Sequence, residues 1–141
     1  MIIIEVKNLY KSYPQPGNKK ESFKAVDGIT FNIEVGEVYG ILGPNGAGKT
    51  TTLEMLEGLN DIDGGSALID GLDVSSNTFK VKEIIGVQLQ ANEYFDRLDL
   101  TELLILFGKL YSQEIDSEGL LKKVDLFDKS NAKPEELSGG Q

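Results

Sequence analysis

The sequence predicts an α/β fold in which a strand–loop–helix unit follows antiparallel strands and precedes a helical region. An apolar run at 38–42 leads into a glycine-rich loop at 43–51, and leucines at helical spacing follow that loop. Loosely alternating apolar residues at 2–9 and 23–35 are typical of strands. Apolar residues at helical spacing also fill the last third of the chain, which indicates helices there.

The glycine-rich loop reads Gly43-Pro44-Asn45-Gly46-Ala47-Gly48-Lys49-Thr50-Thr51 and fits the phosphate-loop pattern G-x-x-x-x-G-K-[ST] at every defined position. Glycines allow a backbone to curl around an anion, and the helix that follows points its positive dipole end at the same place. Lys49 can neutralise the outer phosphates, and the Thr50 hydroxyl can bind Mg²⁺. The whole loop is therefore a candidate nucleotide-binding site.

The sequence on both sides of the loop supplies the elements that phosphate binding requires. Residues 38–42 are expected to form a short buried strand, and residues 49–59 a helix that ends at Gly58 and a polar run. The alternative is a glycine-rich turn that contains Lys and Thr by chance. Because the full pattern and both flanks agree, the phosphate loop is the favoured interpretation.

The remaining elements are predicted from periodicity and turn residues. Asp99 and Glu102 form a candidate capping box at the start of a helix, and Asp70 followed by Gly71 is interpreted as a turn rather than a metal ligand. The expected elements are a loop at 13–20, a turn at 36–37, a strand at 64–71, a helix at 79–85, a strand at 86–90, and helices at 100–111 and 116–127.

Composition narrows the class of protein. The chain has 141 residues, which suits one domain, and a formal net charge of −9, which argues against a nucleic-acid partner. It contains no cysteine and no histidine, so thiolate metal sites and histidine bases are excluded for this sequence. The N-terminus lacks the pattern of a signal peptide, and no apolar run approaches the about 20 residues of a membrane span. We therefore expect a soluble, cytoplasmic protein.

The closing run Leu137-Ser138-Gly139-Gly140-Gln141, together with the phosphate loop, resembles the ATP-binding subunit of an ABC transporter, whose signature motif is Leu-Ser-Gly-Gly-Gln. The resemblance spans the chain. It implies a phosphate-loop NTPase core with an antiparallel β portion and a helical subdomain, incomplete at the C-terminus. Residues 1–90 would form the β-rich nucleotide-binding core, and 91–141 the helical subdomain that ends in the signature motif.

The resemblance also implies roles for single residues. Tyr13 would stack on adenine, and Gln90 would be the Q-loop glutamine, which binds Mg²⁺ and orients water. In a head-to-tail dimer, Ser138, Gly139, Gly140 and Gln141 of one subunit would cap the γ-phosphate held by the other subunit's loop. Taken without the family, Tyr13 fits a surface loop, Gln90 an ordinary strand end, and Ser138 a simple helix cap.

The implied function is an ATP-binding module that couples ATP binding and hydrolysis to transport across a membrane. ATP and Mg²⁺ would be its cofactors, and membrane-spanning subunits and a second ATP-binding subunit its partners, with no nucleic acid. The module would lie at the inner face of the cell membrane. In the family, a strand ending in Asp-Glu and a later histidine follow the signature. We therefore expect a longer subunit, and for this chain alone nucleotide binding with very slow hydrolysis at most.

Two other functions stay open at this stage. A non-transport ABC-type ATPase of DNA repair or translation would share both motifs, although such proteins usually carry two modules or long coiled insertions. A self-contained phosphate-loop kinase or GTPase would need an acidic metal ligand and an acceptor or guanine motif, and none is convincing in this sequence.

Overall fold

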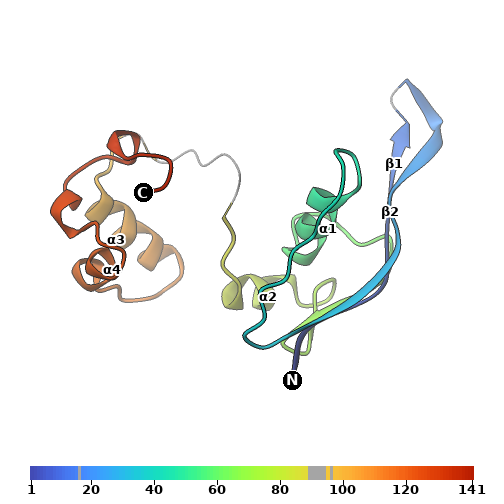
Figure 1. Ribbon diagram of the computed structural model, residues 1–141, viewed down its shortest axis with the longest axis horizontal. Coiled ribbons are helices and arrows are strands. Elements are labelled where there is room, and N and C mark those ends of the chain that lie inside the picture. Colours follow the sequence, from blue (N-terminus) through green and yellow to red (C-terminus); the bar gives the residue numbers. More distant parts are fainter. Residues whose placement is uncertain (16, 89–94, 96) are drawn as a thin grey trace. The chain divides into compact units, whose positions relative to one another are not determined.

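The computed structural model describes residues 1–15, 17–88, 95 and 97–141, which form two compact units, Met1–Val87 and Gln88–Gln141 (Figure 1). The elements of the first unit are β1 (Ile2–Gln15), β2 (Asn18–Glu34), α1 (Lys49–Leu56), β3 (Gly64–Ile69), β4 (Leu72–Asp73) and α2 (Thr78–Ile84). Those of the second unit are α3 (Leu100–Leu110), α4 (Ser117–Lys123) and the short 3-10 turns η1 (Phe127–Lys129) and η2 (Pro134–Glu136).

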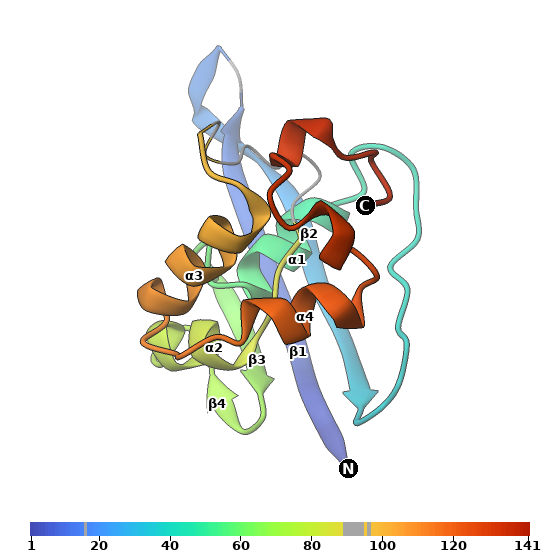
Figure 2. The ribbon, with the colours of Figure 1, turned by 90° about the vertical axis from the view of Figure 1, so that its left-hand side faces the viewer.

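The first unit is built on an antiparallel sheet with strand order β2-β1-β3-β4, so β1 lies between β2 and β3 (Figure 2). The strands predicted at 2–9 and 23–35 are confirmed, but the loop expected at 13–20 is wrong. Strand pairing continues to Gln15 and Asn18, and Gly17 supplies a positive φ of 83° at the tip. Pro14 is tolerated because β1 has no pairing to β3 beyond Tyr10, which leaves that side an edge.

A bulge in β1 explains why its apolar alternation is loose. Val6 and Leu9 are both fully buried although they are an odd number of residues apart. Between them Asn8 adopts a left-handed conformation, with φ 47°, and the pairing with β2 shifts register. Asn tolerates this conformation better than most residues, and its N–H donates to Thr30 Oγ1 at 2.9 Å. The bulge thus returns Leu9 to the core face.

The core of the first unit joins the sheet to both helices. Its buried residues come from β1, β2, α1, β3, α2 and the residue that follows β4: Val6, Leu9, Val26, Met55, Leu56, Ala67, Ile69, Val74 and Val81. The predicted helices at 49–59 and 79–85 are confirmed as α1 and α2, although α1 ends three residues early, before Gly58. Within α1 the buried face is Thr52, Met55 and Leu56, whereas the predicted Leu53 is exposed.

The strand predicted at 64–71 and its closing turn are confirmed as β3 and a hairpin to β4. Ile69 pairs with Leu72, and the residues between them, Asp70 and Gly71, have φ values of 48° and 75°. Positive φ at both central residues is the type I′ turn, which suits Asp-Gly. Asp70 is therefore a turn residue, as the sequence indicated.

The buried strand predicted at 38–42 is wrong. These residues have no strand pairing, and the side chains of Val38 and Leu42 are 100% and 94% exposed. A fully buried strand needs neighbours on both edges and cover on both faces. The described residues contain no strand that pairs with this segment. Residues 86–88 are likewise not a strand, and the remainder of the strand predicted at 86–90 lies outside the described residues.

The second unit is helical, and its caps follow the predicted chemistry. At α3, the Glu102 N–H donates to Asp99 Oδ1 at 2.8 Å and the Asp99 N–H donates to Glu102 Oε2 at 3.1 Å, which confirms the capping box. The helix predicted at 116–127 is shorter, since α4 ends at Lys123 and η1 follows. Leu100 and Leu103 of α3 and Leu121 of α4 are buried. None of the described helices has the length and apolar character needed to cross a bilayer.

An ion pair closes the sheet where the β1–β3 ladder ends. Lys11 Nζ donates to Asp63 Oδ1 at 2.8 Å and to the Asp61 carbonyl oxygen at 2.7 Å. Asp63 Oδ2 also accepts the Ser12 N–H at 2.8 Å. These hydrogen bonds lower the pKa of Asp63, with Lys11 as the largest cause, and the bond to Asp63 raises the pKa of Lys11.

We expect the stability of the first unit to depend on pH through this pair. Because the pKa of Asp63 is lowered by folding, its contribution is complete above the ordinary value of 3.8 and is lost as pH falls through the folded value. Asp63→Asn should therefore reduce the free energy of unfolding near neutral pH and much less in strong acid. Urea denaturation at both pH values measures the difference. An Asn penalty that does not shrink in acid would contradict the assignment.

Candidate nucleotide-binding site

The phosphate loop joins the unpaired segment after β2 to α1. Gly46 and Gly48 both have left-handed backbones, with φ values of 83° and 81°, and Gly48 is the N-cap of α1 without a side-chain cap. The first helical bond runs from the Thr52 N–H to the Gly48 carbonyl at 2.8 Å. Among the described residues no acceptor bonds the N–H groups of Lys49, Thr50 and Thr51. These three donors form the N-terminal end of α1, where an anion can bind.

Lys49 places its charge on the loop itself. Its Nζ donates to the carbonyl oxygens of Gly43 at 2.8 Å and Pro44 at 2.7 Å. The ammonium group therefore folds back along the exposed loop instead of extending into solvent. A phosphate bound in the loop would meet both this cation and the N–H groups of the first helical turn.

Gly48 holds the loop against the sheet. A Cβ added to this residue would lie 2.1 Å from the carbonyl oxygen of Ala25 on β2 and 3.2 Å from Val26 Cγ2. No side chain fits at that distance, so a glycine is needed at position 48 for the close approach of the backbones as well as for its positive φ. Val26 belongs to the same buried cluster as Met55 and Leu56 of α1.

Tyr13 lies on β1 rather than in the expected loop. It pairs with Phe23 of β2, with ring centroids 6.0 Å apart, and Lys11 Nζ is 5.5 Å from the Tyr13 ring centroid. Phe23 is two residues from Ala25, which is about 7 Å along a strand. Tyr13 and the phosphate loop are therefore connected through one short stretch of β2.

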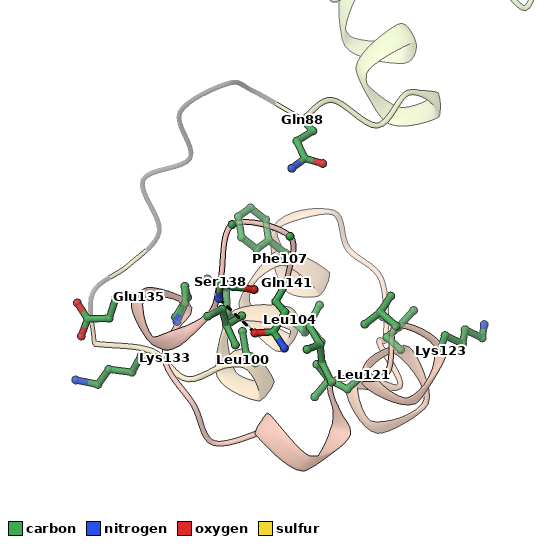
Figure 3. A pocket seen from close by; sticks show the side chains of 18 of the residues that line it. Gln88, Leu100, Leu104, Phe107, Leu121, Lys123, Lys133, Glu135, Ser138 and Gln141 are labelled. Carbon is green, nitrogen blue, oxygen red and sulfur yellow. Dashed lines mark hydrogen bonds between the residues drawn. The ribbon is translucent and has the colours of Figure 1, made fainter. Parts of the chain in front are cut away.

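The signature residues belong to the second unit, where they follow η2 and are exposed. Gln141 Oε1 accepts the Ser138 N–H at 3.2 Å, drawn in Figure 3, and Lys129 Nζ at 2.9 Å, while the Gln141 N–H donates to the Ser138 carbonyl at 2.9 Å. A Cβ at Gly139 or Gly140 would meet nothing within 4 Å. The turn thus presents open glycine backbone beside an apolar hollow lined by Leu100, Leu104, Phe107 and Leu121.

The preceding segment anchors this turn to the start of α3. Leu100 N–H donates to the Ala132 carbonyl at 3.0 Å, and the Thr101 N–H and hydroxyl both donate to the Ser130 carbonyl, at 3.2 and 3.1 Å. The segment that precedes the signature residues is therefore fixed to α3 by hydrogen bonds.

Each predicted site residue can now be placed. The loop Gly43–Thr51 and Tyr13 lie in the first unit, the signature residues lie in the second, and Gln90 lies outside the described residues. Sequence reasoning missed Ala25, Lys11 and Asp63. No local pattern marks them, because their contacts join residues far apart in the chain.

The sequence matches the model of the family described as ABC transporter over residues 26–141. The chain belongs to the ABC transporter family. The fold class predicted from the sequence is confirmed by ATP-binding cassettes among the solved structures.

Two proteins named as ATP-binding proteins are similar to this chain along nearly its whole length. The Nod factor export ATP-binding protein I of Burkholderia orbicola is 38% identical, with 97% of this chain and 44% of the relative covered. The linearmycin resistance ATP-binding protein of Bacillus subtilis is 34% identical, with 98% and 44% covered. The chain thus spans less than half the length of these two relatives.

The structure is similar to that of a dimeric ATP-binding cassette solved in a post-hydrolysis state with ADP and Pi bound. The TM-score is 0.77 at 26% identity, and the match covers 98% of this chain and 64% of that one. The match to this cassette therefore includes residues of both units described here.

We expect Gly48→Ala to damage the loop more than Gly46→Ala does. Both residues have a left-handed φ, which costs a side chain about 1 kcal/mol, but only Gly48 would drive a Cβ into the Ala25 carbonyl. At Gly46 a Cβ meets nothing within 4 Å. Thermal denaturation should show a larger loss for Gly48→Ala, by about 1–3 kcal/mol.

Gly46→Ala is the matched control, because it carries the same backbone strain without the clash. Equal losses for the two variants would show that the contact with Ala25 is unimportant.

Proposed function

We propose that this chain is the ATP-binding module of an ABC transporter and binds ATP·Mg²⁺ through Gly43–Thr51. The observation that carries the proposal is that the Lys49 ammonium lies on the same loop as the first-turn N–H groups of α1, which no described residue bonds. A triphosphate is the anion that such a site suits, because its charge is spread over several oxygens along the loop.

The residues present suit Mg²⁺ as the partner of ATP. Thr50 is exposed at the first turn of α1, and its hydroxyl is of the type that binds Mg²⁺ beside a phosphate loop. The described residues contain no group of three or more acidic side chains that could hold a metal alone. Mg²⁺ usually keeps several waters and binds through one or two protein groups and the phosphates, so Thr50 is a sufficient anchor in this part of the chain.

In the proposed module, the residues before about position 90 bind nucleotide and those after it form a helical subdomain. Tyr13 contributes the base-stacking ring, and Gln90 links the nucleotide to the transporter. Ser138, Gly139, Gly140 and Gln141 serve a second copy in a head-to-tail dimer. The open glycine backbone of the signature turn and the dimeric state of a similar cassette support this arrangement.

For the whole protein we propose ATP hydrolysis coupled to transport, with membrane-spanning subunits that hold the module at the cytoplasmic side. Two relatives are named for Nod factor export and linearmycin resistance, and both names include ATP-binding protein. These names support a transporter over a DNA-repair or translation ATPase. A self-contained kinase or GTPase is not favoured, because the similarity is to ABC proteins throughout.

We expect Lys49→Ala to weaken ATP·Mg²⁺ binding by at least about tenfold, since it removes a charge-assisted contact to the phosphates. Isothermal titration calorimetry on the purified chain measures the dissociation constant. Lys80→Ala is the matched control, because Lys80 is exposed on α2 and away from the loop sequence. ATP binding that is unaffected by Lys49→Ala would overturn the proposed site.

We expect Ser138→Phe to prevent ATP-dependent self-association while ATP affinity changes by less than about twofold, because a large ring blocks the turn without touching Gly43–Thr51. Sedimentation velocity with and without ATP·Mg²⁺ measures the association. Lys109→Phe, at an exposed site on α3 of the same unit, is the control. Undiminished ATP-dependent dimers of Ser138→Phe would contradict a role for the signature turn.

A further inference from the structure

We propose that the Lys11–Asp63 ion pair is a positioning pair that fixes Tyr13 as the surface on which the nucleotide base stacks. The inference rests on the proposed function, since it requires a nucleotide whose phosphates bind at Gly43–Thr51. It assigns a role to two residues that lie outside the phosphate loop and the signature motif.

Three bonds from Asp63 clamp β1 immediately before Tyr13. The Asp63 N–H donates to the Tyr10 carbonyl at 3.2 Å, Oδ1 accepts from Lys11 Nζ, and Oδ2 accepts from the Ser12 N–H. These bonds begin where the β1–β3 ladder stops, at the pair Tyr10 and Gly64. Asp63 therefore supplies hydrogen bonds to residues 10–12 at the point where their pairing with β3 ends.

Lys11 is buried to a degree unusual for lysine, with 8% of the residue exposed. Its ammonium is held between Asp63 Oδ1 and the Asp61 carbonyl, and it lies 5.5 Å from the Tyr13 ring centroid. At this distance the cation attracts the ring. The ring of Tyr13 is thus flanked by a fixed cation and by Phe23, which limits the orientations that it can take.

The clamp also relates Tyr13 to the phosphate loop. Lys11 pairs with Val26 of β2, next to Ala25, whose carbonyl meets Gly48. The segment that carries Asp63 follows α1, and α1 begins at the same loop. The loop is therefore tied to β1 both through β2 and through α1 and the residues after it.

This arrangement predicts that the ion pair affects binding of the base and not of the phosphates. Without the pair, residues 11–13 keep only their pairing to β2, and the Tyr13 ring loses its cation. A base would then have to order the ring on binding, which costs affinity. Inorganic triphosphate has no base and should not be sensitive to the pair.

The test compares ATP·Mg²⁺ with inorganic triphosphate·Mg²⁺ by isothermal titration calorimetry on the wild-type chain and four variants. We expect Tyr13→Ala to weaken ATP binding by about tenfold. Lys11→Met keeps the length of the side chain but removes its charge, and should weaken ATP binding by about threefold to tenfold. Triphosphate binding should change by less than about twofold in both.

Two further variants test whether Lys11 positions Tyr13 or only stabilises the fold. One restores the cation, and the other combines Lys11→Met with Tyr13→Ala. Lys11→Arg keeps a cation that can bond Asp63 and should restore most of the ATP affinity. Lys11→Met combined with Tyr13→Ala should lose no more than Tyr13→Ala alone, because the pair acts through that ring. Asp63→Asn, which retains an acceptor for Ser12, provides a second variant if Lys11→Met does not fold.

Three results would overturn the inference: unchanged ATP affinity in both Lys11→Met and Asp63→Asn, an equal loss for ATP and triphosphate, or additive losses in the double variant. A wild-type chain that binds neither ligand would instead refute the proposed function, and this inference with it.

Discussion

The close approach of the Gly48 and Ala25 backbones fixes the distance between the phosphate loop and the sheet. Gly48 lies so near the Ala25 carbonyl that even a methyl group could not be placed between them. Since neither side of this contact is a side chain that can rotate away, the separation is set by the backbones alone. The packing of Met55 and Leu56 with Val26 holds α1 in the same relation to β2. The start of α1, with the N–H groups of its first turn, is therefore held by the core of the unit.

The strand β1 connects that core to the candidate site. Its first half contributes Val6 and Leu9, brought to one face by the bulge at Asn8. Its second half, which carries Lys11 and Tyr13, pairs with β2 and, among the described strands, with no other. The interactions of Asp63 compensate for the lost partner. One strand thus provides packing at one end and candidate recognition chemistry at the other.

The parts that could be predicted from the sequence depend on local chemistry. The helix after Gly48, the capping box of Asp99 and Glu102, and the Asp70–Gly71 turn each follow from residues within a few positions of one another.

The prediction failed where the structure of a segment depends on residues that are distant in the sequence. Residues 38–42 are apolar enough for a buried strand but have no strand partner in the part of the chain that the structure describes. The turn residues at 13–20 continue as strands because β1 and β2 pair there. The bond from Lys11 to Asp63 spans 52 positions and has no signal in either segment.

The β1–β2 hairpin reaches past the rest of the sheet, and its tip at Gly17 lies beyond the pair Tyr13 and Phe23. Residues added at that tip would lengthen the ribbon outward and leave the aromatic pair, the ion pair and the loop contacts in place. The tip is therefore a position at which an epitope or a fluorescent reporter can be inserted without disturbing the sheet core or the candidate nucleotide-binding loop.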